Sequence, residues 1–249
     1  RDDVAALMRA DVVLYSGFHL EGYLVETLER VAETGTRVVA VAEEILDEGE
    51  VIASAGTPDP HVWMDPSLWR RSAALVASVV GDLVPESRTR IEARASVIEE
   101  RLDALDQDFE LRLQRIPIDR RVLLTAHDAF GYFGRRYDIA VEGIQGVSTA
   151  SEAGLRAIED LVDLVVDRAL PAVFFESTVS ERNVRALVEG AGARGHVVVI
   201  GGVLHADAPG AATSYEGMLR HNVDTIVGAL AGYAAIGEAG GVTAGGPGR

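Results

Sequence analysis

The sequence contains few residue types that could do chemistry, and histidine is the most informative of them. It has no cysteine, which excludes disulfides, thiolate nucleophiles and cysteine-based zinc sites. All 23 basic residues are arginine, so no lysine can form a Schiff base or grip a phosphate. A metal site would need carboxylates and some of the six histidines, which are His19, His61, His127, His196, His205 and His221.

Two of these histidines and one aspartate follow segments that are predicted to be strands. His61 lies in the loop that leaves a first group of strands, and His127 follows the predicted strand 122–125. Asp207 follows the predicted strand 197–200 through a Gly-Gly turn. Because ligands gather at the carboxyl ends of strands in open α/β sheets, we expect these three side chains to converge between two lobes. Nitrogen and oxygen ligands of this kind suit a divalent cation.

The remaining histidines have simpler interpretations. His19 lies where a first strand meets a helix, which is a position near a cleft. His196 begins a strand after a glycine turn, where an exposed imidazole is expected. His221 lies within the last helix and is expected to make a structural hydrogen bond.

Two glycine-containing motifs occur in the wrong context for the chemistry that they suggest. Gly190–Gly195 matches the dinucleotide fingerprint, but it leaves a helix and enters a strand, which is the reverse of the required order. We interpret it as a helix cap and turn. Gly146–Ala150 lacks the final glycine of a serine-hydrolase elbow, and Thr149–Glu152 fits a helix capping box instead.

Short β-branched segments alternate with longer amphipathic ones, which is typical of parallel sheets covered by helices. The predicted strands are 12–15, 37–41, 122–125, 139–143, 172–175 and 197–200. Helices are predicted at 20–32, from 67 to 114 with an interruption at 81–85, from 128, and at 151–168, 182–189 and 214–230. The acidic stretch 42–66, which contains Thr57-Pro58-Asp59-Pro60, is expected to be a loop.

The helical stretch indicates an organisation in two lobes. A helix over 86–115 would be about 45 Å long at about 1.5 Å per residue, enough to span a domain. Its predicted apolar stripe is Ile91, Val97, Ile98, Leu102, Leu105, Phe109 and Leu113. A solvated surface helix is the alternative to a strut between lobes. We expect an α/β fold of two lobes, each with a mainly parallel sheet flanked by helices, joined by one long rigid helix. The expected parts are a lobe at 1–84, the linking helix at 85–116, a second lobe at 117–236 and a disordered glycine-rich tail at 237–249.

Charge and hydropathy exclude several classes of partner. The 249 residues include 39 acidic and 23 basic side chains, so the formal net charge is −16. Such a chain repels phosphate backbones, and a cation is a better ligand than nucleic acid. No segment approaches the ~18 apolar residues of a membrane helix, and the first residues lack the build of a signal peptide.

Six stretches occur in a fixed order along nearly the whole chain. They are Ala10–Glu21, Asp59–Pro66, Thr125–Phe133, Gly143–Thr149, Phe175–Ser177 and Gly201–Asp207. Together they resemble the zinc/manganese substrate-binding proteins of ABC transporters, the cluster A metal receptors of bacterial envelopes. The resemblance implies a receptor that captures Mn²⁺ or Zn²⁺ between two lobes and delivers it to an ABC permease for import.

The resemblance also implies metal ligands at particular residues. They are His61 in Asp-Pro-His-Val-Trp, His127 in Thr-Ala-His-Asp, and Asp207 after Gly-Gly. The family's fourth ligand is a histidine in an Asp-Pro-His segment that is expected upstream of residue 1, together with a first strand-helix unit and the export signal. His19 matches a position that is not normally a ligand. His205 falls where relatives often have an aromatic or apolar residue, and we interpret it as structural.

Several functional alternatives stay open in the sequence. A receptor fills the metal's coordination shell with protein ligands, whereas a catalytic zinc keeps a water and a nearby base. We therefore expect a receptor without enzymatic activity. The resemblance implies that it is a monomer, either periplasmic or lipid-anchored to the cell surface. A metal-dependent hydrolase and a surface adhesin are the alternatives. The segment 42–59 lacks the histidines of zinc-dedicated relatives, and His127 stands where a glutamate would favour manganese, so the metal stays open.

Overall fold

The computed structural model describes residues 2–54, 56–147, 154–176 and 180–232. The described chain forms two compact units. Unit 1 consists of Arg1–Asp108 with Ala129–Phe133, and unit 2 consists of Phe109–Asp128 with Gly134–Arg249. The chain therefore passes between the units three times. The predicted capping box at Thr149–Glu152 and the predicted tail 237–249 lie outside the described residues.

Unit 1 begins with a parallel strand pair that is covered by a helix. Val12 pairs with Arg37 at the start of this β1–β2 ladder, and Leu28 and Val31 of α2 bury their side chains against Val13. The elements of this part are α1 (Asp2–Leu7), β1 (Val12–Tyr15), η1 (Gly22–Leu24), α2 (Val25–Glu33) and β2 (Arg37–Ala40).

The stretch 42–66 is more ordered than expected for a loop. Val41, Ala42 and Ile45 bury one face of a short helix in an apolar cluster, which outweighs the polar composition around them. A small antiparallel hairpin follows, which ends at Pro58, and a short 3-10 helix begins two residues after Pro60. The elements are α3 (Val41–Ile45), η2 (Glu48–Glu50), β3 (Ala53–Ser54), β4 (Thr57–Pro58) and η3 (Val62–Met64).

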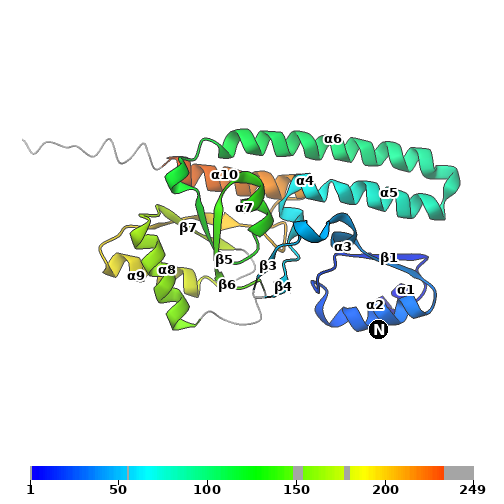
Figure 1. Cartoon of the computed structure of the whole chain (residues 1–249), viewed down its shortest axis with the longest axis horizontal. Coiled ribbons are helices and arrows are strands. Elements are labelled where there is room, and N and C mark those ends of the chain that lie inside the picture. The colour runs from blue at the N-terminus through cyan, green and yellow to red at the C-terminus, as the bar shows by residue number, and fades with distance from the viewer. Residues whose placement is uncertain (1, 55, 148–153, 177–179, 233–249) are drawn as a thin grey trace, which may run out of the picture. The chain divides into compact units, whose positions relative to one another are not determined.

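Two long helices follow and lie side by side (Figure 1). They are preceded by α4 (Pro66–Trp69), and they are α5 (Arg71–Leu83) and, after η4 (Pro85–Ser87), α6 (Arg88–Leu113). The long helix predicted from sequence is confirmed, and its 26 residues span about 39 Å. The boundary between the units falls within α6.

The predicted apolar stripe of α6 is wrong for two residues. Val97 and Ile98 are 54% and 46% exposed, whereas Leu102, Leu105 and Phe109 are buried. Where α6 faces α5, the buried residues are small, namely Ala77 and Ala95, so larger side chains in this part of α6 remain outside.

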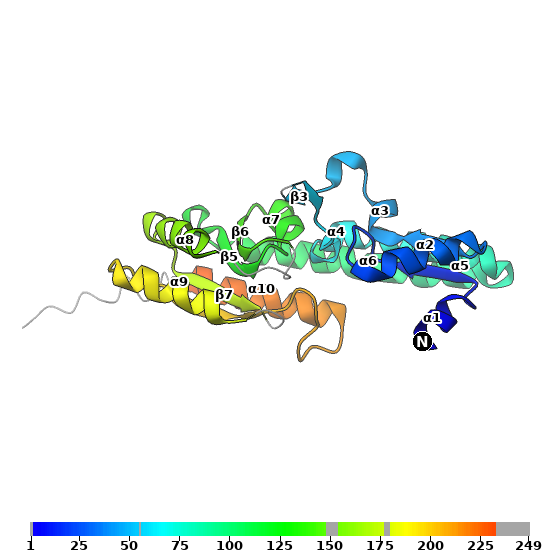
Figure 2. The ribbon, with the colours of Figure 1, turned by 90° about the horizontal axis from the view of Figure 1, so that it is seen from below.

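Unit 2 is built on parallel strand pairs with helices on both faces. β5 pairs with β6 and β7 with β8, and β5 and β7 are also neighbours. Alternate residues of a strand point to opposite faces. Val173 and Phe175 pack with α8 and α9, which lie beside each other (Figure 2), and Phe174 points toward Ala229 of α10. The elements are η5 (Ile118–Arg120), β5 (Val122–His127), α7 (Gly131–Tyr137), β6 (Ala140–Gln145), α8 (Leu155–Asp167), β7 (Ala172–Glu176), α9 (Arg182–Ala193), β8 (Val199–Leu204) and α10 (Tyr215–Gly232).

Several glycines of unit 2 lie within a strand or a helix, where turns were expected. Gly201–Gly202 was expected to be a turn, but β8 continues through it with a bulge opposite Val173 and Phe174. A Cβ at Gly201 would lie 2.6 Å from Phe174 and 2.8 Å from Ala229, so glycine permits close packing of strand and helix here. Helix α9 likewise continues through Gly190 and Gly192, and only Gly195, at φ +81°, serves the chain reversal.

Candidate metal centre

His61 of unit 1 is held by a carboxylate two residues before it. The backbone N–H of His61 donates to Asp59 Oδ1 at 2.9 Å, and the ring Nδ1 lies 2.6 Å from the same oxygen. Both residues are almost fully buried. An ionised carboxylate only accepts hydrogen bonds, so it favours the tautomer with hydrogen on Nδ1. In that tautomer the lone pair of the ring is on Nε2, which is the nitrogen that can bind a metal.

His127 of unit 2 is held in the same way by a distant residue. It is the last residue of β5, and Glu176 is the last residue of β7, so the two lie at carboxyl ends of neighbouring strands. The N–H of His127 donates to Glu176 Oε1 at 2.8 Å, and its Nδ1 lies 2.6 Å from Glu176 Oε2. Thr125 also donates its hydroxyl to the His127 carbonyl at 2.7 Å. Backbone and ring of His127 are therefore both fixed.

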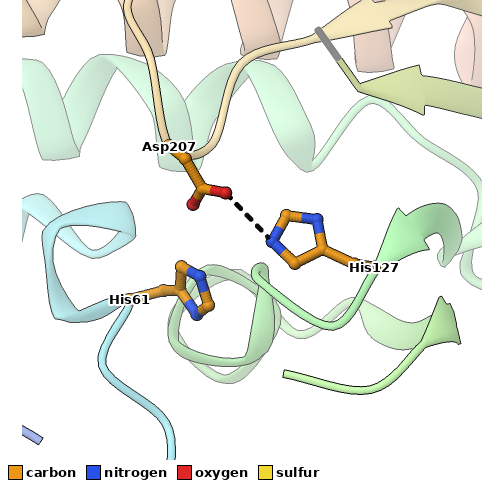
Figure 3. Close-up of side chains that lie close together, drawn as sticks. All are labelled: His61, His127 and Asp207. Carbon is orange, nitrogen blue, oxygen red and sulfur yellow. Dashed lines mark ion pairs between the residues drawn. The ribbon is translucent and has the colours of Figure 1, made fainter. Parts of the chain in front are cut away.

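Asp207 faces the other ring nitrogen of His127 (Figure 3). Its Oδ2 lies 3.6 Å from His127 Nε2, and its side chain is 33% exposed. This distance is too long for a hydrogen bond. Two atoms that each bind one tetrahedral ion at about 2.0–2.2 Å are about 3.4 Å apart, so the pair has the separation of two ligands of one metal.

The chain segment before Asp207 is fixed by helix α10. Asn222 accepts from the N–H of His205 at 2.9 Å and donates to its carbonyl at 2.7 Å. The His205 ring stacks on His221 with centroids 4.7 Å apart. Burial lowers the pKa of His205, and His221 lowers it further.

Two of the other histidines bond to backbone carbonyls, and the third is exposed. The predicted hydrogen bond of His221 is confirmed, since its Nε2 lies 2.9 Å from the Val203 carbonyl oxygen. His196 is half-buried rather than exposed, because its Nε2 bonds to the Leu170 carbonyl at 2.8 Å. His19 is exposed and has φ +62°.

The carboxylates that hold the two histidines were not predicted. Asp59 and Glu176 both lie in the stretches that resemble a known family, but no role was assigned to either. The available signals were a carboxylate two residues from His61 and a glutamate that ends a strand. Neither signal identifies a partner by itself.

In the described part of the chain, no helix combines the length and hydrophobicity needed to cross a lipid bilayer.

Comparison with known proteins gives consistent matches. The family model described as "Zinc-uptake complex component A periplasmic" (ZnuA) matches residues 1–229. The zinc-binding protein TroA of Treponema pallidum is 45% identical over 234 residues, which cover 92% of this chain and 75% of TroA. The manganese-binding lipoprotein MntA of Bacillus subtilis is 43% identical over 233 residues, which cover 92% and 76% of the two chains. The solved structure of periplasmic TroA from Treponema pallidum has a TM-score of 0.86 at 42% identity and covers 92% of this chain and 84% of that chain.

Proposed function

Since this chain belongs to the ZnuA family of zinc-uptake components, we propose that it captures a divalent metal ion outside the cytoplasm and delivers it to an ABC permease for import. Mn²⁺ or Zn²⁺ is the cargo. Similarity to zinc-binding TroA and manganese-binding MntA supports both metals and favours this function over a hydrolase or an adhesin. The net charge of −16 suits a cation carrier and disfavours a nucleic-acid partner.

We propose His61, His127 and Asp207 as ligands of one ion. The observation that carries this proposal is the arrangement around His127, whose Nδ1 is held by Glu176 while its Nε2 faces Asp207 at 3.6 Å. A histidine that binds a metal commonly gives its other ring nitrogen to a carboxylate. His61 with Asp59 repeats this arrangement in unit 1.

The proposed ligand set favours binding over catalysis. Two imidazoles and a carboxylate bind Zn²⁺ and Mn²⁺, and the general affinity order favours zinc. Each imidazole is buried and is held by its own carboxylate, so these carboxylates are not placed as the base that a catalytic zinc needs.

We propose a monomeric receptor, either free in the periplasm or attached by a lipid.

Replacing a ligand tests the proposal. Protein stripped of metal by a chelator is titrated with Zn²⁺ and with Mn²⁺, and affinity and stoichiometry are measured by calorimetry. We expect one ion per chain in the parent, and losses in His61→Ala, His127→Ala and Asp207→Ala that exceed the about 100-fold reached by changes beyond the ligands. His196→Ala is the matched control, because the His196 ring bonds to the Leu170 carbonyl and not to a proposed ligand.

Parent-like affinity in all three ligand variants would contradict the ligand set. An exchangeable water on the bound metal, together with hydrolysis of a test ester, would support the hydrolase instead.

A further inference from the structure

The hydroxyl of Tyr132 occupies an unusual place in the hairpin that leads to His61. The β3–β4 register pairs Ala53 with Pro58, so Ile52 and Asp59 are the next opposed residues. In an antiparallel ladder alternate pairs exchange two N–H···O bonds, and Ile52 with Asp59 is such a pair because the preceding one contains Pro58, which has no N–H. Here Asp59 N–H donates directly to the Ile52 carbonyl at 2.8 Å, but the reciprocal bond is replaced by Tyr132.

The replacement uses both hydrogen-bonding functions of the hydroxyl. It accepts from Ile52 N–H at 3.2 Å and donates to the Asp59 carbonyl at 3.0 Å. The ring of Tyr132 is fully buried in the apolar cluster that contains Val41, Ile45 and Val62. The hydroxyl is therefore held in position by packing, and the hairpin end is opened around it.

Asp59 is fixed at both backbone groups as a result. Pro58 and Pro60 flank it and have no N–H, so Asp59 supplies the one backbone donor of these three residues. Its carboxylate then holds both the backbone and the ring of His61. A Cβ at the neighbouring Gly131 would lie 2.9 Å from Asp59 Oδ2, so the same segment also limits where that carboxylate can move.

We infer that Tyr132 is a positioning residue for metal binding, which acts through Asp59 on the orientation of His61. This inference rests on the proposed function. Tyr132 follows His127 by five residues in the sequence, so the segment that carries one proposed ligand also orients another.

Tyr132→Phe tests the inference, because it keeps the buried ring and removes only the hydroxyl. We expect Zn²⁺ affinity to fall about 10-fold, at the lower end of effects seen when groups beyond the ligands are changed. We also expect the visible absorption bands of the Co²⁺-loaded protein to shift, since they report ligand geometry. Ile45→Val is the matched control, because it removes one buried carbon from the same cluster without touching a polar group.

The outcomes separate the inference from the proposed function. A Tyr132→Phe protein with parental affinity and parental Co²⁺ bands overturns the inference, as does an equal loss of affinity in Ile45→Val. In both cases metal binding by the parent, and its loss in His61→Ala, leave the proposed function standing. A parent that binds no metal overturns the function itself.

Discussion

Glu176 contacts both the backbone and the ring of His127: one oxygen accepts from the amide N–H at 2.8 Å, and the other lies 2.6 Å from Nδ1. The two residues are 49 positions apart in the sequence and end neighbouring strands. A single carboxylate therefore contacts both the backbone and the ring of one proposed ligand, and a partner of this kind favours hydrogen on Nδ1 and raises the basicity of Nε2.

Neutralising this carboxylate should weaken metal binding without removing a ligand. Glu176→Gln keeps the shape but loses the charge that raises the basicity of His127, so we expect Zn²⁺ affinity to fall about 10–100-fold. Competition with a chromophoric chelator measures the change. Glu26→Gln, at a strongly exposed position of α2, is the control and should bind like the parent. An unchanged affinity in Glu176→Gln would show that His127 needs no such partner.

Removing the amide of Asn222 should affect both stability and metal binding. Asn222→Leu keeps the volume but loses the two bonds to the His205 backbone, and we expect a cost of about 1–3 kcal/mol in the free energy of unfolding. Asp207 lies two residues further on, so its position should become less defined and metal release faster. Stopped-flow chelation measures that rate.

The matched control for this prediction is Thr225→Ser. It retains on the same helix the hydroxyl that donates to the His221 carbonyl. Release from Asn222→Leu at the parental rate would mean that the Asp207 segment is held by other contacts.

Asp65 should make stability depend on pH. Burial raises the pKa of this carboxyl above its usual value of 3.8, and the nearby Asp106 raises it further, while hydrogen bonds from Ser67 and Leu68 oppose the rise. An acid with a raised pKa in the folded state binds protons more tightly there, so stability is lost as pH rises from 3.8 through the folded pKa. The loss persists at neutral pH.

Asp65→Asn removes this penalty and keeps an oxygen that can cap helix α4. We expect its Tm to exceed that of the parent by about 2–4 °C at pH 7, and the difference to shrink toward pH 4. Thermal unfolding followed by circular dichroism at both pH values checks this. A difference that is the same at both would assign the effect to something other than titration of Asp65.

Two glycines of unit 2 should respond in opposite ways to alanine. Gly201→Ala places a Cβ 2.6 Å from Phe174 and should destabilise the protein by about 1–3 kcal/mol through overpacking. Gly228→Ala has open space around the new Cβ within helix α10 and should stabilise it by about 0.5–1 kcal/mol. Urea unfolding gives both values. Equal effects would contradict the close approach of β8 and α10.

The strands could be predicted well because the apolar, β-branched pattern that indicates a strand lies within the strand's own few residues. Val12–Tyr15 was predicted at its observed bounds, and the α/β class followed from the alternation of such segments with amphipathic ones. The pattern failed at Gly201–Gly202, where glycine normally indicates a turn but here permits a strand to approach a helix. It also failed for 42–66, where a few buried residues form a helix within a polar stretch.

The proposed ligands could be selected from sequence because they lie in recognisable stretches, whereas their supports could not. Glu176 reaches His127 across 49 residues, and the Tyr132 hydroxyl reaches Asp59 across 73. Such pairs depend on which strands become neighbours and on how a core packs. No spacing along the chain encodes them.

The path of the chain between the units has a consequence for the order of synthesis. Unit 1 buries Tyr132 in its apolar cluster. Residues 109–128, which belong to unit 2, are synthesised before Tyr132. A nascent chain that ends at Asp108 thus lacks part of the core of unit 1. The unit can be completed only after strand β5 has been made, so neither unit corresponds to a continuous fragment that could be cut out and expressed intact.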